Sequence, residues 1–273
     1  MNKKKVLSSA ISIALASVMC VGLAACGESE NSESPSKFAQ SFVSEKIDEA
    51  TWNEFFNEKD EKGVCGLKSF NNVKVQFEVK WAYETETYKA VREMTATYTY
   101  ADCKEHVKAI CKDTVEGEVP DEDTEFIQAG EKEYEYYILY TNADQREAWY
   151  PDTTFRVVQQ ENGKKVVKDV DVELEDYFGV GSAIWEFSSL YAILTLVEYG
   201  ADYSKLEYSE EVKGYKGYDG DVEEGDGYLS FIYKFQDKKL KTYYLEIHEG
   251  APQEFYFLFT YGGQSVTVPN VTK

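Results

Sequence analysis

The sequence predicts an α+β fold, in which a curved, half-barrel-like antiparallel sheet carries a buried central helix on its concave face. The main observation is a period of two in residues 72–83, where apolar and polar side chains alternate as in a strand with one buried face. The same alternation returns in several later segments. Residues 181–199, in contrast, are apolar almost all round, with Ser182 as N-cap and Gly200 as a stop, which predicts a buried helix.

The first 25 residues are predicted to be a signal peptide (1–25), because lysines at positions 3–5 precede an apolar run over 6–23. The run ends in Leu23-Ala24-Ala25-Cys26, which resembles the lipobox of bacterial lipoproteins. This resemblance implies cleavage before Cys26, a diacylglyceryl group on its thiol and anchoring at the outer face of the cell membrane. An ordinary signal peptide with an incidental cysteine is the alternative. Residues 26–37, rich in serine and acid, are then expected to form a flexible tether.

A short helix and a run of strands are expected next. Asp48 is a suitable N-cap, and Trp52, Phe55 and Phe56 follow at helical spacing, so one face of a helix over 48–57 is aromatic. Asn162-Gly163 predicts a two-residue hairpin turn. Alternating apolar residues predict strands at 73–83, 88–100, 104–114, 132–141, 154–160 and 165–172.

The segment after the central helix returns to the period of two. Its apolar residues predict strands at 227–235, 240–248, 253–261 and 265–268. We therefore expect one α+β domain over residues 38–273. Because each half has a helix followed by strands, two subdomains, 38–172 and 173–273, are the alternative.

The chain is strongly acidic. Its 273 residues include 50 Asp and Glu against 29 Lys and Arg, which gives a net charge of −21. Such a charge repels nucleic acids and anionic headgroups, so a nucleic-acid partner is excluded, and it also keeps an exported protein soluble.

The cysteines do not establish whether the chain has a disulfide. With Cys20 removed and Cys26 acylated, a disulfide that includes Cys65 and no disulfide at all both stay open for Cys65, Cys103 and Cys111.

No catalytic centre can be assembled from the sequence. His106 and His248 are the only histidines, and neither has the spacing of a zinc site. Cys103 and His106 would face opposite sides of one strand, which argues against a nucleophile and its base. Residues 219–226 resemble the first half of a calcium loop, but Glu224 stands where glycine is needed. We therefore expect no enzymatic activity, no bound metal and no cofactor.

Three stretches resemble a loose family of uncharacterised lipoproteins from Gram-positive anaerobes. They are Ile-Asp-Glu-Ala-Thr-Trp at 47–52, Leu-Glu-Tyr at 206–208, and the closing segment 259–269 with its Gly262-Gly263 pair. This resemblance implies no particular activity. The expected arrangement of a helix and a curved meander is also similar to the half-barrel carriers of lipids and lipoproteins, LolA-like and LppX-like. That second likeness concerns architecture alone.

The predicted architecture indicates a binding role. A half-barrel covered by an apolar helix leaves a space between two apolar surfaces, which suits an apolar small molecule. The helix face expected to pack on the sheet holds Ile184, Phe187, Tyr191 and Leu194. The other apolar side chains, predicted to contact the ligand, are Trp185, Ile193 and Leu196.

We therefore expect a non-enzymatic carrier of an apolar ligand, held at the lipid bilayer through acylated Cys26. A structural or interaction lipoprotein with a packed interior is one alternative. A glycan-binding surface lipoprotein is another, because a strand with aromatic residues on both faces can expose one set of rings to solvent. The tyrosines concerned are Tyr134, Tyr136, Tyr137 and Tyr140.

Overall fold

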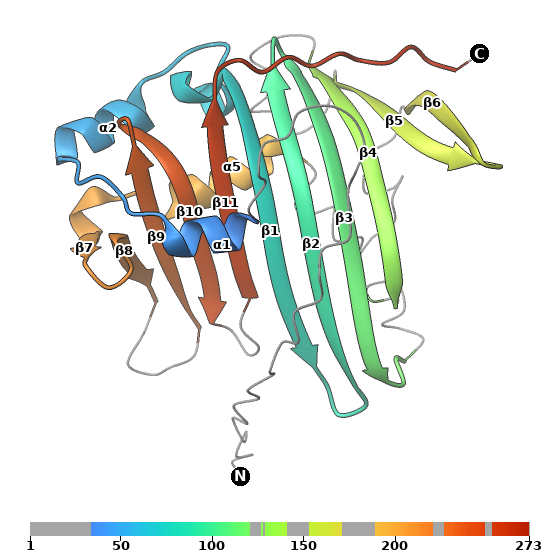
Figure 1. The fold of residues 1–273 in the computed structure, drawn as a ribbon, viewed down its shortest axis with the longest axis horizontal. Coiled ribbons are helices and arrows are strands. Elements are labelled where there is room, and N and C mark those ends of the chain that lie inside the picture. Colours follow the sequence, from blue (N-terminus) through green and yellow to red (C-terminus); the bar gives the residue numbers. More distant parts are fainter. Residues whose placement is uncertain are drawn as a thin grey trace. The chain divides into compact units, whose positions relative to one another are not determined.

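The computed structural model describes residues 34–120, 127, 129–140, 153–170, 189–220, 227–248 and 253–272. Most of these residues belong to strands, which Figure 1 shows side by side in one sheet. The strands are β1 (Asn72–Glu84), β2 (Tyr88–Ala101), β3 (Lys104–Gly117), β4 (Gly130–Tyr140), β5 (Thr153–Glu161), β6 (Lys164–Val170), β7 (Glu207–Ser209), β8 (Gly214–Asp219), β9 (Tyr228–Gln236), β10 (Lys239–His248) and β11 (Gln253–Tyr261). All pairs are antiparallel, in the order β6-β5-β4-β3-β2-β1-β11-β10-β9-β8-β7.

The helices of the described part are short. They are the α-helices α1 (Pro35–Ser41), α2 (Glu49–Asn57) and α5 (Leu190–Tyr199) and the 3-10 helices η1 (Val64–Gly66), η2 (Lys68–Phe70) and η5 (Tyr203–Lys205). Figure 1 shows α1 in front of the sheet and α5 behind it, so the two helices cover opposite faces. Among the described helices, none has the length and apolar character needed to cross a membrane.

The predicted α+β class and the half-barrel are wrong, although the antiparallel sheet is confirmed. The described residues form a single open sheet of eleven strands that starts at β6 and ends at β7, and the described α-helices have only 7, 9 and 10 residues. The prediction assumed one long helix over residues 181–199, but the described helix starts only at Leu190, with Ser189 as its N-cap. Residues 181–188, including Ser182, Ile184, Trp185 and Phe187, lie outside the described part.

The sheet has two chemically different faces, and β1 defines them. Val73, Val75, Phe77 and Val79 are buried on what we call the inner face, while residues 74, 76, 78 and 80 lie on the outer face and are partly exposed. The register continues this division into the neighbouring strands, because Val75 pairs with Phe259 of β11 and Tyr98 of β2. The inner-face residues form one apolar core with α2 and α5. Each fully buried side chain of this size contributes about 1.5–3 kcal/mol.

Several local predictions are confirmed. The Asp48 side chain accepts a hydrogen bond from Thr51 N and caps α2, which buries its aromatic face. Asn162 and Gly163 both have positive φ and join β5 to β6, as expected of a two-residue hairpin. The strand expected at 265–268 is wrong. Strand β11 is already paired on both edges, with β1 and β10, so no edge remains for a hairpin after Gly262 and Gly263.

The first described helix begins before the expected boundary at residue 38. Helix α1 starts at Pro35, because proline fits the first helical turn, where its missing N–H leaves no intrahelical bond unmade. The rest of the expected tether, residues 26–33, lies outside the described part. The ranges 38–172 and 173–273 both supply strands to the same sheet, which they share through the β1–β11 pair.

Candidate functional site

The predicted ligand contacts on α5 belong to the apolar core. Ile193 has no exposed surface, and Leu196 is partly buried and packs against the core. The carbonyl oxygens of Leu196 and Val197 accept hydrogen bonds from Tyr243 Oη (3.1 Å) and Tyr233 Oη (2.8 Å) on the inner face. These two bonds hold the C-terminal end of α5 to the sheet. Trp185, the third predicted contact, lies outside the described residues.

A buried carboxyl group, Glu105, lies at the start of β3 on the inner face. Glu105 has no exposed surface, although it occupies a position where the alternation calls for an apolar residue. Its Oε1 accepts from Leu190 N at the start of α5 (2.5 Å), and its Oε2 accepts from Tyr140 Oη (2.9 Å). Burial raises the pKa of the Glu105 carboxyl to about 8, although both hydrogen bonds act in the opposite direction. Glu105 therefore links β3, the end of β4 and the start of α5.

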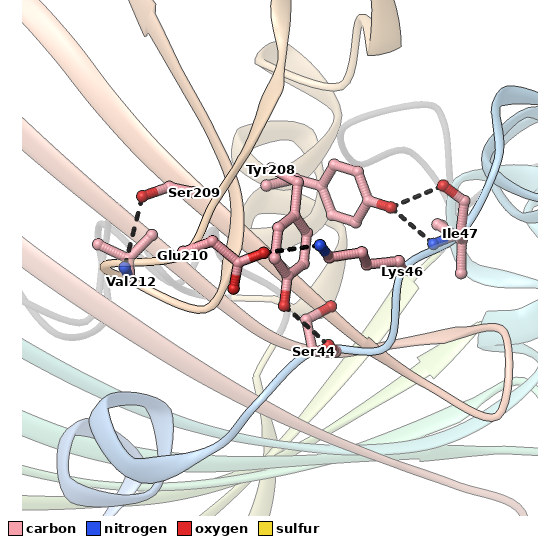
Figure 2. A network of polar contacts seen from close by, with 8 residues as sticks. Ser44, Lys46, Ile47, Tyr208, Ser209, Glu210 and Val212 are labelled. Carbon is pink, nitrogen blue, oxygen red and sulfur yellow. Dashed lines mark hydrogen bonds and ion pairs between the residues drawn. The ribbon is translucent and has the colours of Figure 1, made fainter.

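Residues 42–47, which we call the strap, bind to β7, to β8 and to the turn between them (Figure 2). Tyr208 Oη donates to Ser44 O (3.2 Å), and Lys46 Nζ pairs with Glu210 Oε1 (2.6 Å). The Tyr215 hydroxyl donates to Ile47 O and accepts from Ile47 N, both at 2.6 Å. Each neutral bond of this kind contributes about 0.5–1.5 kcal/mol net, so the strap is held by their sum rather than by one contact.

Helix α1 precedes the strap and lies on the outer face against β1, β10 and β11. Its C-terminal carbonyl groups, Ala39 O and Phe42 O, accept hydrogen bonds from Lys234 Nζ at 2.6 and 2.8 Å. Lys234 is buried, and this desolvation lowers its pKa to about 8. A cation at a helix C-terminus satisfies carbonyl groups that have no intrahelical partner. The segment that precedes the strap is therefore fixed to the outer face.

The outer face of β8–β11 carries a group of aromatic and polar side chains beside α1. In register, Tyr244 pairs with Tyr256 and Glu246 pairs with Glu254 across β10 and β11, while His248 pairs with Tyr228 across β10 and β9. Their ring centroids are 4.7 Å apart for Tyr244 and Tyr256 and 4.0 Å apart for Tyr228 and His248. We call this set the outer-face patch; it consists of Tyr218, Tyr228, Ser230, Tyr244, Glu246, His248, Glu254 and Tyr256.

The two carboxylates of the outer-face patch lie between its rings. Glu254 Oε1 accepts from Tyr244 Oη and Tyr256 Oη at 3.4 and 3.3 Å. Glu246 Oε2 accepts from Ser230 Oγ at 3.3 Å and lies 3.1 Å from His248 Nε2 without hydrogen-bond geometry, so that this buried nitrogen has no hydrogen-bond partner. Desolvation is the largest cause that raises the Tyr256 pKa to about 12. In the described chain, neither carboxylate pairs with lysine or arginine.

The other histidine, His106, has a structural environment on the outer face. Its ring stacks on Tyr137 with centroids 4.2 Å apart, and its Nε2 lies 3.2 Å from Glu135 Oε1. The His106 hydrogen bond is the main cause that lowers the Glu135 pKa to about 2, and Lys108 and Lys165 act in the same direction. Nothing in this group pairs a nucleophile with a base, so we assign it no catalytic role.

The remaining predicted positions give no site within the described residues. Cys103 lies in the β2–β3 turn, Cys111 is buried on β3, and both thiols are free. No set of three metal-ligating side chains gathers in the described ranges. Of the calcium-like stretch, only Asp219 and Gly220 are described, and Asp219 accepts a hydrogen bond from Tyr199 Oη. Of the tyrosines suggested for glycan stacking, Tyr134, Tyr136 and Tyr137 are buried.

Sequence reasoning missed Glu105 and the outer-face patch, although both break the period of two. Glu105 puts a charge into the apolar positions of its strand, and Tyr244 and Tyr256 put aromatic rings into the polar positions of theirs. Such exceptions are the sequence signal for a buried polar group or a surface site. The strap has no comparable signal, because its partners are more than 150 residues away.

No family model matches this chain, and no curated protein matches it. Its function must therefore be inferred from the residues and contacts described above.

Proposed function

We propose that this protein is a lipid-anchored binding protein at the outer face of the cell membrane, without catalytic activity, and that it binds its ligand on the exterior of the sheet. The lipobox-like sequence before Cys26 supports the anchor. The strap and α1 support a folded part that is fixed to its anchor-side segment by many polar contacts. The packing of the interior supports a ligand site on the exterior.

The burial of the α5 side chains is the observation that favours a ligand site on the exterior over one in the interior. A side chain beside a ligand-sized space keeps surface that a solvent molecule can touch. Ile193 and Leu194, which are adjacent and therefore point about 100° apart around the helix, both keep none. Leu190 is equally enclosed, and Val197 almost so. Protein atoms therefore enclose more than one side of α5, which supports a ligand site on the exterior rather than next to Ile193.

Anchoring can be tested by changing Cys26. We expect Cys26→Ser to move the protein from the membrane fraction to the medium, or to leave the signal peptide uncleaved, because serine cannot carry the thioether-linked diacylglyceryl group. Fractionation followed by intact-mass measurement of the N-terminus distinguishes these results. Normal cleavage together with unchanged membrane retention would contradict the anchor. Cys103→Ser, a change of the same kind within the folded part, is the matched control and should leave retention unchanged.

The packed interior predicts similar behaviour on different sides of α5. We expect Ile193→Ala and Leu194→Ala each to lower the free energy of unfolding by about 2–5 kcal/mol, because each leaves a cavity in the core. We also expect no uptake of a fluorescent fatty acid by the wild type. Denaturant titration and fluorescence measure the two properties. Uptake by the wild type, altered by Leu196→Ala without loss of stability, would restore the carrier of an apolar ligand.

A further inference from the structure

We propose that the outer-face patch is a saccharide-binding site, and that the saccharide it takes carries no negative charge. This inference rests on the proposed function, because it places the ligand on the exterior of the sheet. It adds the chemical class of the ligand and the residues that contact it.

The rings of the patch suit the apolar C–H face of a sugar. Tyrosine combines an apolar ring with a polar hydroxyl group, which is the arrangement needed to contact both the C–H face and the hydroxyl edge of a saccharide. Tyr244, Tyr228 and Tyr256 are partly exposed, and Tyr218 at the margin of the patch is 43% exposed, with its ring centroid 6.4 Å from that of Tyr228. These rings lie on both sides of the Glu246–Glu254 pair in the register of the strands.

The carboxylates suit the hydroxyl groups of the same ligand. An ionised carboxylate only accepts hydrogen bonds, and each sugar hydroxyl group has a hydrogen to donate. The present donors, Ser230 Oγ, Tyr244 Oη and Tyr256 Oη, lie 3.3–3.4 Å from their acceptors, beyond the usual range for O–H···O bonds. A ligand hydroxyl group can approach to about 2.7 Å and so make the stronger bond.

The local charge excludes anionic sugars. Glu246 and Glu254 face each other on adjacent strands, an arrangement of like charges that is unfavourable unless donors or cations surround it. Lys80 pairs in register with Glu254, but no ion pair joins them in the described structure. An acidic saccharide would add a third negative charge to this group, on a chain whose net charge is −21. A neutral or amine-bearing sugar meets no such repulsion.

Calorimetric titration of the full chain tests the site with four probes of similar size. They are chitotetraose, which carries free amines, its neutral N-acetylated form, an anionic galacturonate tetramer and tetralysine. We expect the two chitin-type probes to bind and the galacturonate tetramer not to bind. We expect tetralysine to bind at least tenfold more weakly than chitotetraose, because it has no sugar face for the rings.

Matched variants locate the binding. Glu246→Gln and Glu254→Gln keep the side-chain shape, and each should weaken saccharide binding about tenfold, since each replaces a charge-assisted hydrogen bond by a neutral one. Tyr218→Ala, at an exposed position, should weaken it several-fold. Glu133→Gln makes the same charge change at an exposed position of β4 and should leave the affinity unchanged. Melting curves confirm that each variant is folded.

Each alternative result overturns the site. Equal affinity for galacturonate, tetralysine at least as tight as chitotetraose, or equal weakening by Glu133→Gln would show that the patch does not select a non-anionic saccharide. Absence of binding by both chitin-type probes would also reject it. In that case normal anchoring through Cys26 and a packed α5 would still support the proposed function, so the two failures are distinguishable.

Discussion

Replacing Trp52 by alanine should lower the free energy of unfolding by about 3–5 kcal/mol, which is among the largest single effects expected in this chain. Trp52 has no exposed surface and connects α2 to η5 and the sheet. Its Nε1 donates to Ala201 O at 2.8 Å. Five aromatic rings lie within 6 Å of its ring centroid, those of Phe56, Tyr203, Tyr215, Tyr233 and Phe235. For a domain of this size the melting temperature should fall by roughly 6–20 °C.

Two further variants separate the causes of that loss. Trp52→Phe keeps an aromatic ring but removes the indole N–H, and it should cost about 1–3 kcal/mol because Ala201 O loses its donor. Val43→Ala changes an apolar side chain that is 53% exposed and should shift stability by less than about 0.5 kcal/mol. If Trp52→Ala were no more harmful than Val43→Ala, the aromatic group around α2 would not be part of the folding core.

Strand positions were predictable because each long strand has one buried face. Over residues 72–80 of β1 the burial of side chains alternates residue by residue as the sequence does, and β2, β9, β10 and β11 fall within one or two residues of their expected bounds. Helix α2 was predictable for an equally local reason, since Asp48 and the spacing of its three aromatic residues act within one or two turns. Local patterns of this kind need no knowledge of the fold.

The short strand β8 was not predictable, because glycine replaces the expected apolar residue. Gly217 of β8 lies on the inner face, where a side chain would normally be buried. A Cβ atom at this position would come within 2.4 Å of the Phe231 ring and 2.5 Å of the Leu206 side chain. The space is thus filled from neighbouring elements. The missing apolar residue removes the sequence signal while the packing remains complete.

The pairing of β1 with β11, which joins the two halves of the sheet, also could not be predicted from local patterns. Strand β1 lies between β2, its neighbour in sequence, and β11 at the other end of the chain. The apolar inner faces and more polar outer faces of β1 and β11 are compatible with this pairing, but the faces of several other strands are equally compatible with it. Long-range register depends on the combined fit of all strands. The same reason applies to the outer-face patch, which needs β8–β11 side by side before its residues meet.

Glu105 should make the stability of this protein fall as the pH rises from about 5 to about 8. In the unfolded chain the carboxyl has its ordinary pKa of 4.5, and in the folded chain burial raises that pKa to about 8. Between these values the folded state holds a proton that the unfolded state has released. The stabilising contribution is therefore complete below about 4.5 and is lost as the pH rises through the window. One proton corresponds to about 1.4 kcal/mol per pH unit.

Glu105→Gln isolates this contribution from the other carboxyl groups. Glutamine keeps an acceptor for Leu190 N and offers an amide N–H to the Tyr140 hydroxyl oxygen, while it cannot ionise. We expect the variant to match the wild type near pH 5. Between about pH 5.5 and 7.5 it should become more stable than the wild type by roughly 2–3 kcal/mol. Urea titrations at intervals of half a pH unit measure the difference.

The comparison between variant and wild type is informative because, among the described residues, tyrosines rather than other acids surround this carboxyl. Burial also raises the pKa of Tyr98 and of Tyr140, and the charge of Glu105 acts in the same direction, so both hydroxyl groups stay protonated throughout the window. Glu131→Gln, on an exposed carboxyl of β4, is the control and should give a curve parallel to the wild type. A parallel curve for Glu105→Gln as well would mean that Glu105 is already ionised in the folded protein. The N–H group of Leu190 on α5 and the O–H group of Tyr140 on β4 would then stabilise the carboxylate charge more than burial destabilises it.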